Sequence, residues 1–222
     1  MERPIWVVST ARSGTTYLCD VLNRTGLFRP EFAEHLNLVY GNRGGLLRRD
    51  PGRFRFCKVF PEQLRNSGVT LREVAALLPG VRFVSLRRRS LVDRAVSLYL
   101  AQRSGVYTVS EEAAEGDFAR FVSTPEGYMG RALPCDAADC MGFYARVVEE
   151  ERSLESALST VAHHEVSYES VVSGAGLPGL FRELGLGADA ASCAASSPLR
   201  QMPEREESAR LRRVLAAMTC KV

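Results

Sequence analysis

A cluster of small, hydroxylated and basic residues follows the first apolar segment of the chain. Residues 9–17 read S-T-A-R-S-G-T-T-Y. Gly14 lets the backbone turn and approach an anion closely. The N–H groups of Thr15, Thr16 and Tyr17 are expected to point at that anion from the start of a helix, whose dipole has its positive end there. The pattern therefore predicts a phosphate-binding loop.

The side chains of this segment favour the same chemistry. Ser13, Thr15 and Thr16 supply hydroxyl donors, and Arg12 supplies a planar guanidinium suited to charged oxygens. The simpler interpretation is an ordinary strand–helix turn capped by a serine or threonine. Such a turn does not require Arg12 and three hydroxyls together, so we favour an anion site.

The segment also lacks the lysine of a nucleoside-triphosphate P-loop, which requires G-x-x-x-x-G-K-[ST]. Thr15 follows Gly14 directly, and Ser9 occupies the position of the first glycine. ATP or GTP hydrolysis is therefore disfavoured. A nucleotide with a single 5′-phosphate that bears another small anion fits better.

The elements that must position this loop alternate between strands and helices. Short apolar runs predict strands at residues 5–9, 54–60, 81–86 and 165–168. Helical periodicity and capping residues predict helices from Thr15 to a Gly26 cap and at 70–78, 90–104, 143–158, 177–184 and 204–218. Residues 107–134 are weakly patterned and are expected to form a mobile substrate loop, and residues 187–198, mostly Ala and Ser, are expected to be disordered.

This alternation predicts an α/β protein, a single domain over residues 1–222 with a central parallel sheet of about four to five strands flanked by helices. Ligands of such sheets bind beyond the carboxyl ends of the strands. The loops after Ser9 and after Leu86 both leave from that edge.

The second of these loops is basic. Arg87-Arg88-Arg89 ends the third predicted strand, and Ser97 follows Arg89 by eight residues on the next predicted helix. Arg89 would lie just before a helix N-terminus, where a phosphate is favoured. The alternative is a surface charge run with Ser97 packed at a helix contact.

Arg-Ser-Gly-Thr-Thr after an apolar strand resembles the 5′-phosphosulfate loop of sulfotransferases that use 3′-phosphoadenosine-5′-phosphosulfate (PAPS), the bacterial trehalose 2-sulfotransferase-like family in particular. The resemblance implies a three-layer, P-loop-like fold and a clamp on the 3′-phosphate by Arg89 and Ser97. It extends more weakly to Lys58 on a strand, to Tyr168-Glu169 in place of a Y-E-D-L turn, and to Arg200-Gln201 near the nucleotide. Ser170 and Val171 replace the last two residues of that turn.

The same resemblance implies a glutamate general base soon after the first helix. The candidates are Glu34, then Glu31, with His35 third, and their spacing departs from the family's pattern. A solvated loop is the alternative for each of them. Sulfuryl transfer needs positioning and charge stabilisation rather than a metal.

We therefore predict a bacterial, cytoplasmic PAPS-dependent sulfotransferase acting on a hydroxyl of a small-molecule, carbohydrate or lipid acceptor. The alternatives are a P-loop-like kinase or hydrolase and a catalytically degenerate PAPS-binding protein. The acceptor and the oligomeric state stay open.

Bulk composition is compatible with this prediction. A formal charge of +3 and a pI of about 8.6 are too mildly basic for a nucleic-acid binder. No apolar run is long enough to cross a bilayer. The six cysteines contain no C-x-x-C motif and are expected to be mostly buried thiols, with no zinc site. Arg48-Arg49 and Arg212-Arg213 are expected to be solvated faces, and His163-His164 structural.

Overall fold

The structure is a computed structural model that describes residues 3–26, 44–111, 121–131, 133, 135–187 and 189–219. The chain divides into two compact units. Unit 1 contains Met1–Arg89 and Glu150–Ser197, and unit 2 contains Ser90–Glu149 and Pro198–Val222. The single domain over residues 1–222 stays a prediction.

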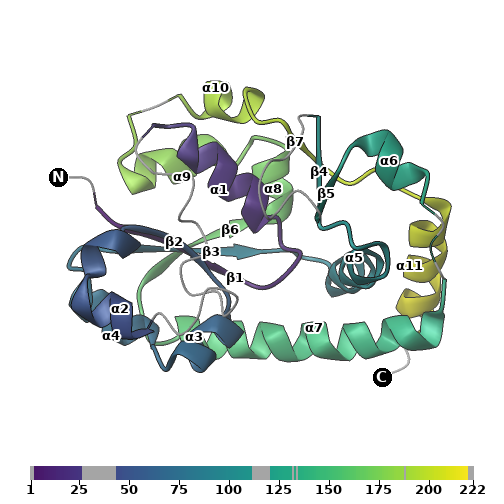
Figure 1. Cartoon of the computed structure of the whole chain (residues 1–222), viewed down its shortest axis with the longest axis horizontal. Helices are drawn as coiled ribbons and strands as arrows, with labels where there is room; N and C mark the ends of the chain where they lie inside the picture. The colour runs from purple at the N-terminus through teal and green to yellow at the C-terminus, as the bar shows by residue number, and fades with distance from the viewer. Residues whose placement is uncertain are drawn as a thin grey trace. The chain divides into compact units, whose positions relative to one another are not determined.

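Unit 1 is built on a parallel sheet (Figure 1). Its order is β2 (Phe56–Val59), β1 (Ile5–Ser9), β3 (Arg82–Arg87) and β6 (His163–Ser167). Every neighbouring pair of these strands is parallel. The predicted α/β architecture with a central parallel sheet flanked by helices is thus confirmed, with four strands.

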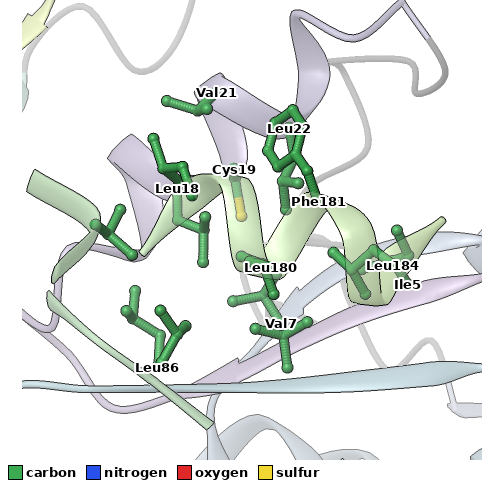
Figure 2. Close-up of a cluster of buried hydrophobic side chains, with 14 of the residues drawn as sticks. Ile5, Val7, Leu18, Cys19, Val21, Leu22, Leu86, Leu180, Phe181 and Leu184 are labelled. Atoms are coloured by element: carbon green, nitrogen blue, oxygen red, sulfur yellow. The ribbon is translucent and has the colours of Figure 1, made fainter. Parts of the chain in front are cut away.

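The strands are apolar because helices cover both faces of the sheet. All five residues of β1 are buried. Ile5 and Val7 belong to a cluster with α1 (Thr15–Asn23), α9 (Leu177–Leu184) and α10 (Ala190–Ala195), part of which Figure 2 shows. Trp6 and Val8 belong to the cluster on the opposite face. Successive side chains of a strand point to opposite faces of the sheet, so a strand that is apolar throughout, such as β1, needs cover on both faces. The three layers (helices, sheet, helices) follow from this.

The opposite face of the sheet is covered by short helices. They are α2 (Gly44–Arg49), the 3₁₀ helix η3 (Pro51–Phe54), α3 (Pro61–Ser67) and α4 (Leu71–Leu77), joined by the C-terminal part of α7 (Ala137–Leu158). Thr70 caps α4 as predicted, since its hydroxyl accepts the Glu73 N–H at 3.1 Å. The predicted strand at 54–60 is shorter than expected, because Phe54 ends η3 and Phe60 caps α3.

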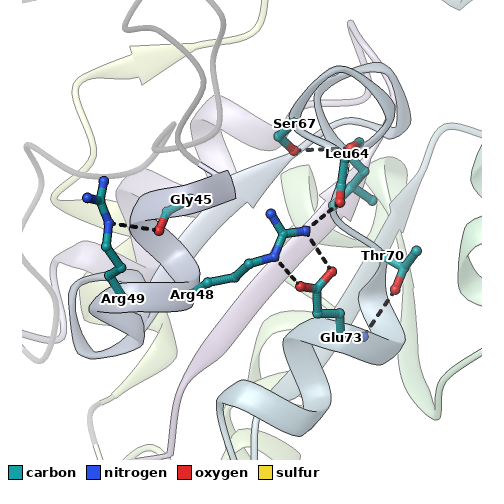
Figure 3. A network of polar contacts seen from close by, with 8 residues as sticks. Gly45, Arg48, Arg49, Leu64, Ser67, Thr70 and Glu73 are labelled. Atoms are coloured by element: carbon teal, nitrogen blue, oxygen red, sulfur yellow. Dashed lines mark hydrogen bonds and ion pairs between the residues drawn. The ribbon is translucent and has the colours of Figure 1, made fainter.

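Arg48 is exposed, as predicted, and it also makes an ion pair that the sequence did not indicate. Its guanidinium donates to both Glu73 carboxylate oxygens, at 2.5 and 3.2 Å, and to the Gly68 carbonyl at 2.7 Å (Figure 3). The hydrogen bond and charge of Arg48 lower the pKa of the Glu73 carboxyl. Glu73 therefore ties α2 to α4 instead of closing a capping box with Thr70.

The segment expected to be disordered contains a helix, so that prediction was wrong for its central part. Residues 190–195 form α10, and the Asp189 side chain caps it by accepting the N–H groups of Ala191 and Ser192. Hydrogen bonds from Ser192 and Ala191 lower the pKa of the Asp189 carboxyl. Helix α9 ends at the Gly185 cap, as predicted. The short helix α8 (Tyr168–Val172), which was not predicted, begins where β6 ends.

Unit 2 is mainly helical. It contains α5 (Leu91–Ser104), α6 (Pro125–Met129), the first part of α7 and α11 (Glu206–Thr219), and α5 packs against α11. A small sheet has the order β5 (Val122–Ser123), β4 (Thr108–Ser110) and β7 (Leu199–Arg200). The described residues of the region 107–134, which was expected to be one mobile loop, thus include two strands and a helix. Its buried Val109 and Tyr128 pack with Val106 and Met202.

Two arginines of unit 2, Arg94 and Arg212, are not simply solvated surface residues. Arg94 is fully buried and donates to the Val147 carbonyl at 2.9 Å. Arg212 pairs with Asp93 at 2.7 Å and with Glu204 at 2.5 Å, so the prediction of a solvated face was wrong for Arg212, whereas Arg213 is exposed.

None of the helices in the described ranges combines the length and the apolar character needed to cross a membrane.

Four described cysteines are buried free thiols, namely Cys19, Cys57, Cys140 and Cys193, and Cys135 is half-buried. Burial, aided by the nearby Cys135 and Asp139, raises the pKa of the Cys140 thiol to about 11. The reactive thiolate is therefore scarce at neutral pH.

We expect native Cys140 to react with iodoacetamide much more slowly than Cys135, with the rate rising as pH increases toward the raised pKa. Peptide mapping by mass spectrometry measures both sites. Denaturation should remove the difference. Equal labelling of the two cysteines in the native protein would contradict the burial of Cys140.

Candidate anion-binding site

The carboxyl ends of three strands meet at one edge of the unit 1 sheet. The register pairs Ser9 of β1 with Leu86 of β3, and Arg87 of β3 with Ser167 of β6. The strand order β2-β1-β3 means that the chain leaves β1 toward one side and β3 toward the other. In open α/β sheets this switch point, at β1 and β3, is where ligands bind.

The loop after β1, residues 10–14 (the Gly14 loop), is held by buried hydroxyl groups. Ser9 Oγ donates to the Leu86 carbonyl at 2.5 Å, which joins the ends of β1 and β3. Thr10 Oγ1 and Ser13 Oγ share a hydrogen bond of 2.9 Å. Ser9, Thr10 and Ser13 are all buried. The Ser13 hydroxyl therefore shapes the loop from inside.

The backbone of the Gly14 loop is left-handed at two positions. Gly14 has φ +83° and Arg12 has φ +64°, the single non-glycine residue with positive φ in the described ranges. The left-handed conformation costs an L-residue such as Arg12 roughly 1–2 kcal/mol. Strain of this kind persists where the surrounding structure enforces it and is concentrated at functional sites.

The Gly14 loop leads into the N-terminus of α1. Gly14 is the N-cap residue, and the first intrahelical bond runs from Leu18 N–H to the Gly14 carbonyl at 3.1 Å. The N–H groups of the first turn therefore have no acceptor within the helix itself. Thr15 is buried and Thr16 is exposed, so Thr16 presents the accessible hydroxyl of this turn. Such a terminus favours an anion.

The residues Arg87–Arg89 (the arginine segment) have three different environments. The Arg87 guanidinium lies 3.3 Å from the Glu151 carboxylate and 3.2 Å from that of Glu155. The Arg88 guanidinium lies 4.8 Å from the centre of the Tyr168 ring.

Arg89 differs from both neighbours. Its side chain is exposed, and its backbone N–H donates to Glu169 Oε1 at 3.2 Å. Within the described part of the chain, the Arg89 guanidinium has no hydrogen-bond or ion-pair partner. Of the three arginines, Arg89 therefore has the guanidinium available for an external anion.

Ser167, Tyr168 and Glu169 (the Tyr168 turn) lie beside both segments. A Cβ atom added to Gly14 would overlap Cδ2 of the Tyr168 ring and lie 2.8 Å from its Cε2. Glycine is therefore required at position 14 by close packing as well as by its positive φ.

The predicted site residues fall into three groups. Arg12, Ser13, Gly14, Thr15, Thr16, Tyr17 and Arg89 all lie at the carboxyl edge of the unit 1 sheet. Ser97, on α5, and Arg200, in β7, belong to unit 2, so the pairing of Arg89 with Ser97 stays a prediction. Glu31, Glu34 and His35 lie outside the described residues.

Sequence reasoning missed the structural part played by Thr10 and understated that of Tyr168 and Glu169. A buried threonine that bonds a serine three residues later leaves no distinctive pattern. Contact between Tyr168 and Gly14 joins distant parts of the chain, and the likeness to a Y-E-D-L turn was its sole signal. Lys58, singled out by the same likeness, is buried on β2, with its Nζ 5.8 Å from the centre of the Phe60 ring.

The donors at this edge are backbone N–H groups, a hydroxyl and guanidinium groups, which suit phosphate or sulfate oxygens. Their placement on the neighbouring strands β1 and β3 suits a ligand with two separated anionic groups. Among the described residues, His, Cys, Asp and Glu side chains form no group of three or more able to hold a metal ion.

No protein-family model matches the chain, and no curated protein matches it. Among solved structures, the chain is similar to a sulfotransferase domain from the curacin biosynthetic pathway. The two share 15% sequence identity with a TM-score of 0.43, over 97% of this chain and 98% of that one. At this level of similarity, the function has to be inferred from the site residues.

We expect Gly14→Ala to destabilise the protein more than Gly68→Ala. Both glycines have positive φ, but a Cβ at Gly68 meets nothing within 4 Å. Gly68→Ala should cost about 1–2 kcal/mol of unfolding free energy from backbone strain, and Gly14→Ala should add about 1–3 kcal/mol from overpacking against Tyr168. Urea denaturation measures both values. Equal losses would contradict the close packing of Gly14.

Proposed function

We propose that this chain is a sulfotransferase that binds PAPS at the carboxyl edge of the unit 1 sheet and transfers its sulfuryl group to an acceptor hydroxyl. The main supporting observation is the exposed Arg89 guanidinium at the end of β3, beside the helix N-terminus that follows β1. Two anion sites on neighbouring strands match a nucleotide with a phosphosulfate at one position and a phosphate at another.

In this proposal the 5′-phosphosulfate binds at the N-terminus of α1. The N–H groups of Thr15, Thr16 and Tyr17, the Thr16 hydroxyl and the Arg12 guanidinium are its donors. Arg89 binds the 3′-phosphate, together with Ser97, and Arg200 approaches the nucleotide. Ser13 and Gly14 keep the loop in its left-handed conformation, which lets the backbone come close to the ligand.

The reaction is an in-line displacement at sulfur. The acceptor oxygen forms a bond to sulfur while the bond from sulfur to the bridging oxygen breaks, and the acceptor proton passes to a general base. Adenosine 3′,5′-bisphosphate leaves with the electron pair of the broken bond. Charge grows on the bridging oxygen, next to the α1 N-terminus and Arg12, so these donors stabilise the transition state more than the ground state.

For the general base we propose Glu34, with Glu31 and then His35 as the next candidates. A carboxylate or imidazole within hydrogen-bond reach of the acceptor removes its proton as the new bond forms. The acceptor is a small-molecule, carbohydrate or lipid hydroxyl.

A kinase or hydrolase is less well supported, because no lysine follows Gly14 to contact the β- and γ-phosphates of a triphosphate. A PAPS-binding protein without catalysis shares the same anion sites. Only turnover of an acceptor hydroxyl would distinguish an enzyme from such a binding protein.

We expect wild-type protein to bind adenosine 3′,5′-bisphosphate in calorimetric titration. It should not bind ATP with magnesium. Arg89→Ala should weaken the bisphosphate by about 1.5–3 kcal/mol, the usual contribution of a hydrogen bond to a charged group. Arg72→Ala, which removes an exposed arginine from α4 of the same unit, is the matched control and should leave the affinity unchanged. Binding of ATP but not of the bisphosphate would overturn the PAPS assignment in favour of a kinase-like protein.

We expect Glu34→Gln to lower kcat of sulfuryl transfer by about 10²-fold or more, the usual loss when a general base is removed. Its affinity for adenosine 3′,5′-bisphosphate should not change. Glu31→Gln and His35→Gln are the comparison variants. Full activity of all three variants would exclude these residues as the base, and wild-type binding without turnover of any hydroxyl acceptor would leave the PAPS-binding protein.

A further inference from the structure

The Tyr168 turn contacts the two anion-binding segments at once. The Tyr168 ring packs on the Gly14 backbone so closely that a methyl group at Gly14 would overlap it. The centre of the same ring lies 4.8 Å from the Arg88 guanidinium. One aromatic side chain therefore contacts both the Gly14 loop and the arginine segment.

Glu169 makes a second contact from the same turn. Its Oε1 accepts the backbone N–H of Arg89 at 3.2 Å. This bond fixes the peptide that carries Arg89 and leaves its guanidinium exposed. The strand register supports the arrangement, because Arg87 pairs with Ser167 at the point where β3 and β6 both end.

We propose that Tyr168 and Glu169 are positioning residues that set the spacing between the two anion sites without touching the ligand. This inference rests on the proposed function, since the sites are those assigned to the 5′-phosphosulfate and the 3′-phosphate. A ligand that bridges both sites gains affinity when they are already at the right separation, because no ordering has to accompany binding. A ligand that uses one site gains nothing from that spacing.

The two residues act by different contacts, so each has its own conservative variant. Tyr168→Phe keeps the ring that packs on Gly14 and under Arg88, whereas Tyr168→Ala removes it. Glu169→Gln keeps an oxygen that accepts the Arg89 N–H, whereas Glu169→Ala removes it. Glu165→Ala, at an exposed position of β6, and Tyr144→Ala, at a half-buried position of α7, are matched controls.

The first measurement is binding of two probes, adenosine 3′,5′-bisphosphate and adenosine 5′-monophosphate, by calorimetry. Tyr168→Ala and Glu169→Ala should each weaken the bisphosphate at least about tenfold more than the monophosphate, since the loss falls on the bridging ligand. Tyr168→Phe and Glu169→Gln should retain the wild-type ratio of the two affinities, as should both controls. An equal loss for the two probes would indicate general destabilisation and would overturn the proposal.

The second measurement needs no ligand. Amide hydrogen exchange of the apo protein should become faster in peptides covering residues 10–17 and 87–90 in Tyr168→Ala, with no change in α4. In Glu169→Ala the faster exchange should be confined to residues 87–90. Unchanged exchange in these peptides would also overturn the proposal. If Tyr168→Ala does not fold, Glu169→Ala decides by the same criteria.

The two measurements separate this inference from the proposed function. If the wild-type protein binds neither nucleotide, the proposed function falls, and the exchange data alone decide whether the Tyr168 turn holds the two segments together. If the bisphosphate binds and the variants leave its affinity and the exchange rates unchanged, the proposed function stands and the positioning role falls.

Discussion

The contact between the Tyr168 ring and the Gly14 backbone is the constraint on which the geometry of the candidate site depends. It requires a residue without a side chain at position 14, and the same residue must adopt positive φ. The hydrogen bond from Ser9 to the Leu86 carbonyl then fixes the end of β1 against β3, and the bond between Thr10 and Ser13 holds the loop from inside. These contacts let the strained Arg12 backbone persist, because several independent bonds oppose its relaxation.

Contacts at the same edge of the sheet also offset the electrostatic repulsion within the arginine segment. Three consecutive arginines repel one another, and each would be costly to desolvate without compensation. The carboxylates of Glu151 and Glu155 compensate Arg87, and the electron-rich face of Tyr168 compensates Arg88. Glu169 compensates the peptide of Arg89 while leaving its guanidinium in solvent. Among these three arginines, Arg89 alone therefore keeps its guanidinium exposed, while its two neighbours make contacts within the fold.

Features with a local cause could be predicted from the sequence. Ser90 and Thr70 cap α5 and α4 through N–H groups three residues away, and Gly185 ends α9 in the left-handed conformation. These interactions involve neighbouring residues, so their pattern is visible in a short stretch. The first helix was predicted to end at a Gly26 cap, but it ends at Asn23 with Arg24 as its C-cap, and Gly26 follows with positive φ and donates to the Asn23 carbonyl at 3.0 Å.

Features with a distant cause could not be predicted in this way. The ion pairs of Arg48 with Glu73 and of Arg212 with Asp93 were not predicted, because the partners are far apart along the chain. The Ala/Ser tract lacks apolar periodicity, yet Cys193 of α10 is buried in the cluster on α1 and α9, and this tertiary packing selects the helix. Within the site, the loop was predictable from its own residues, whereas the Tyr168 turn was not. In the proposed site, the loop for one anion is thus specified locally, whereas its position relative to the arginine segment depends on the register of β1, β3 and β6 and on the Tyr168 turn.

In the proposed transfer reaction, the geometry of the Gly14 loop and its distance from the arginine segment have different effects. Donors at the α1 N-terminus are fixed by backbone bonds before any ligand arrives, so they do not have to reorganise as charge grows on the bridging oxygen. Their effect depends on where the bridging oxygen lies, and that position is set by how the nucleotide is held at its other phosphate. Binding energy at Arg89 therefore contributes to catalysis only when the two segments keep a fixed separation. The residues that maintain the separation are then as important to the rate as those that contact the phosphosulfate, although they lie outside the sequence motif that identifies the loop.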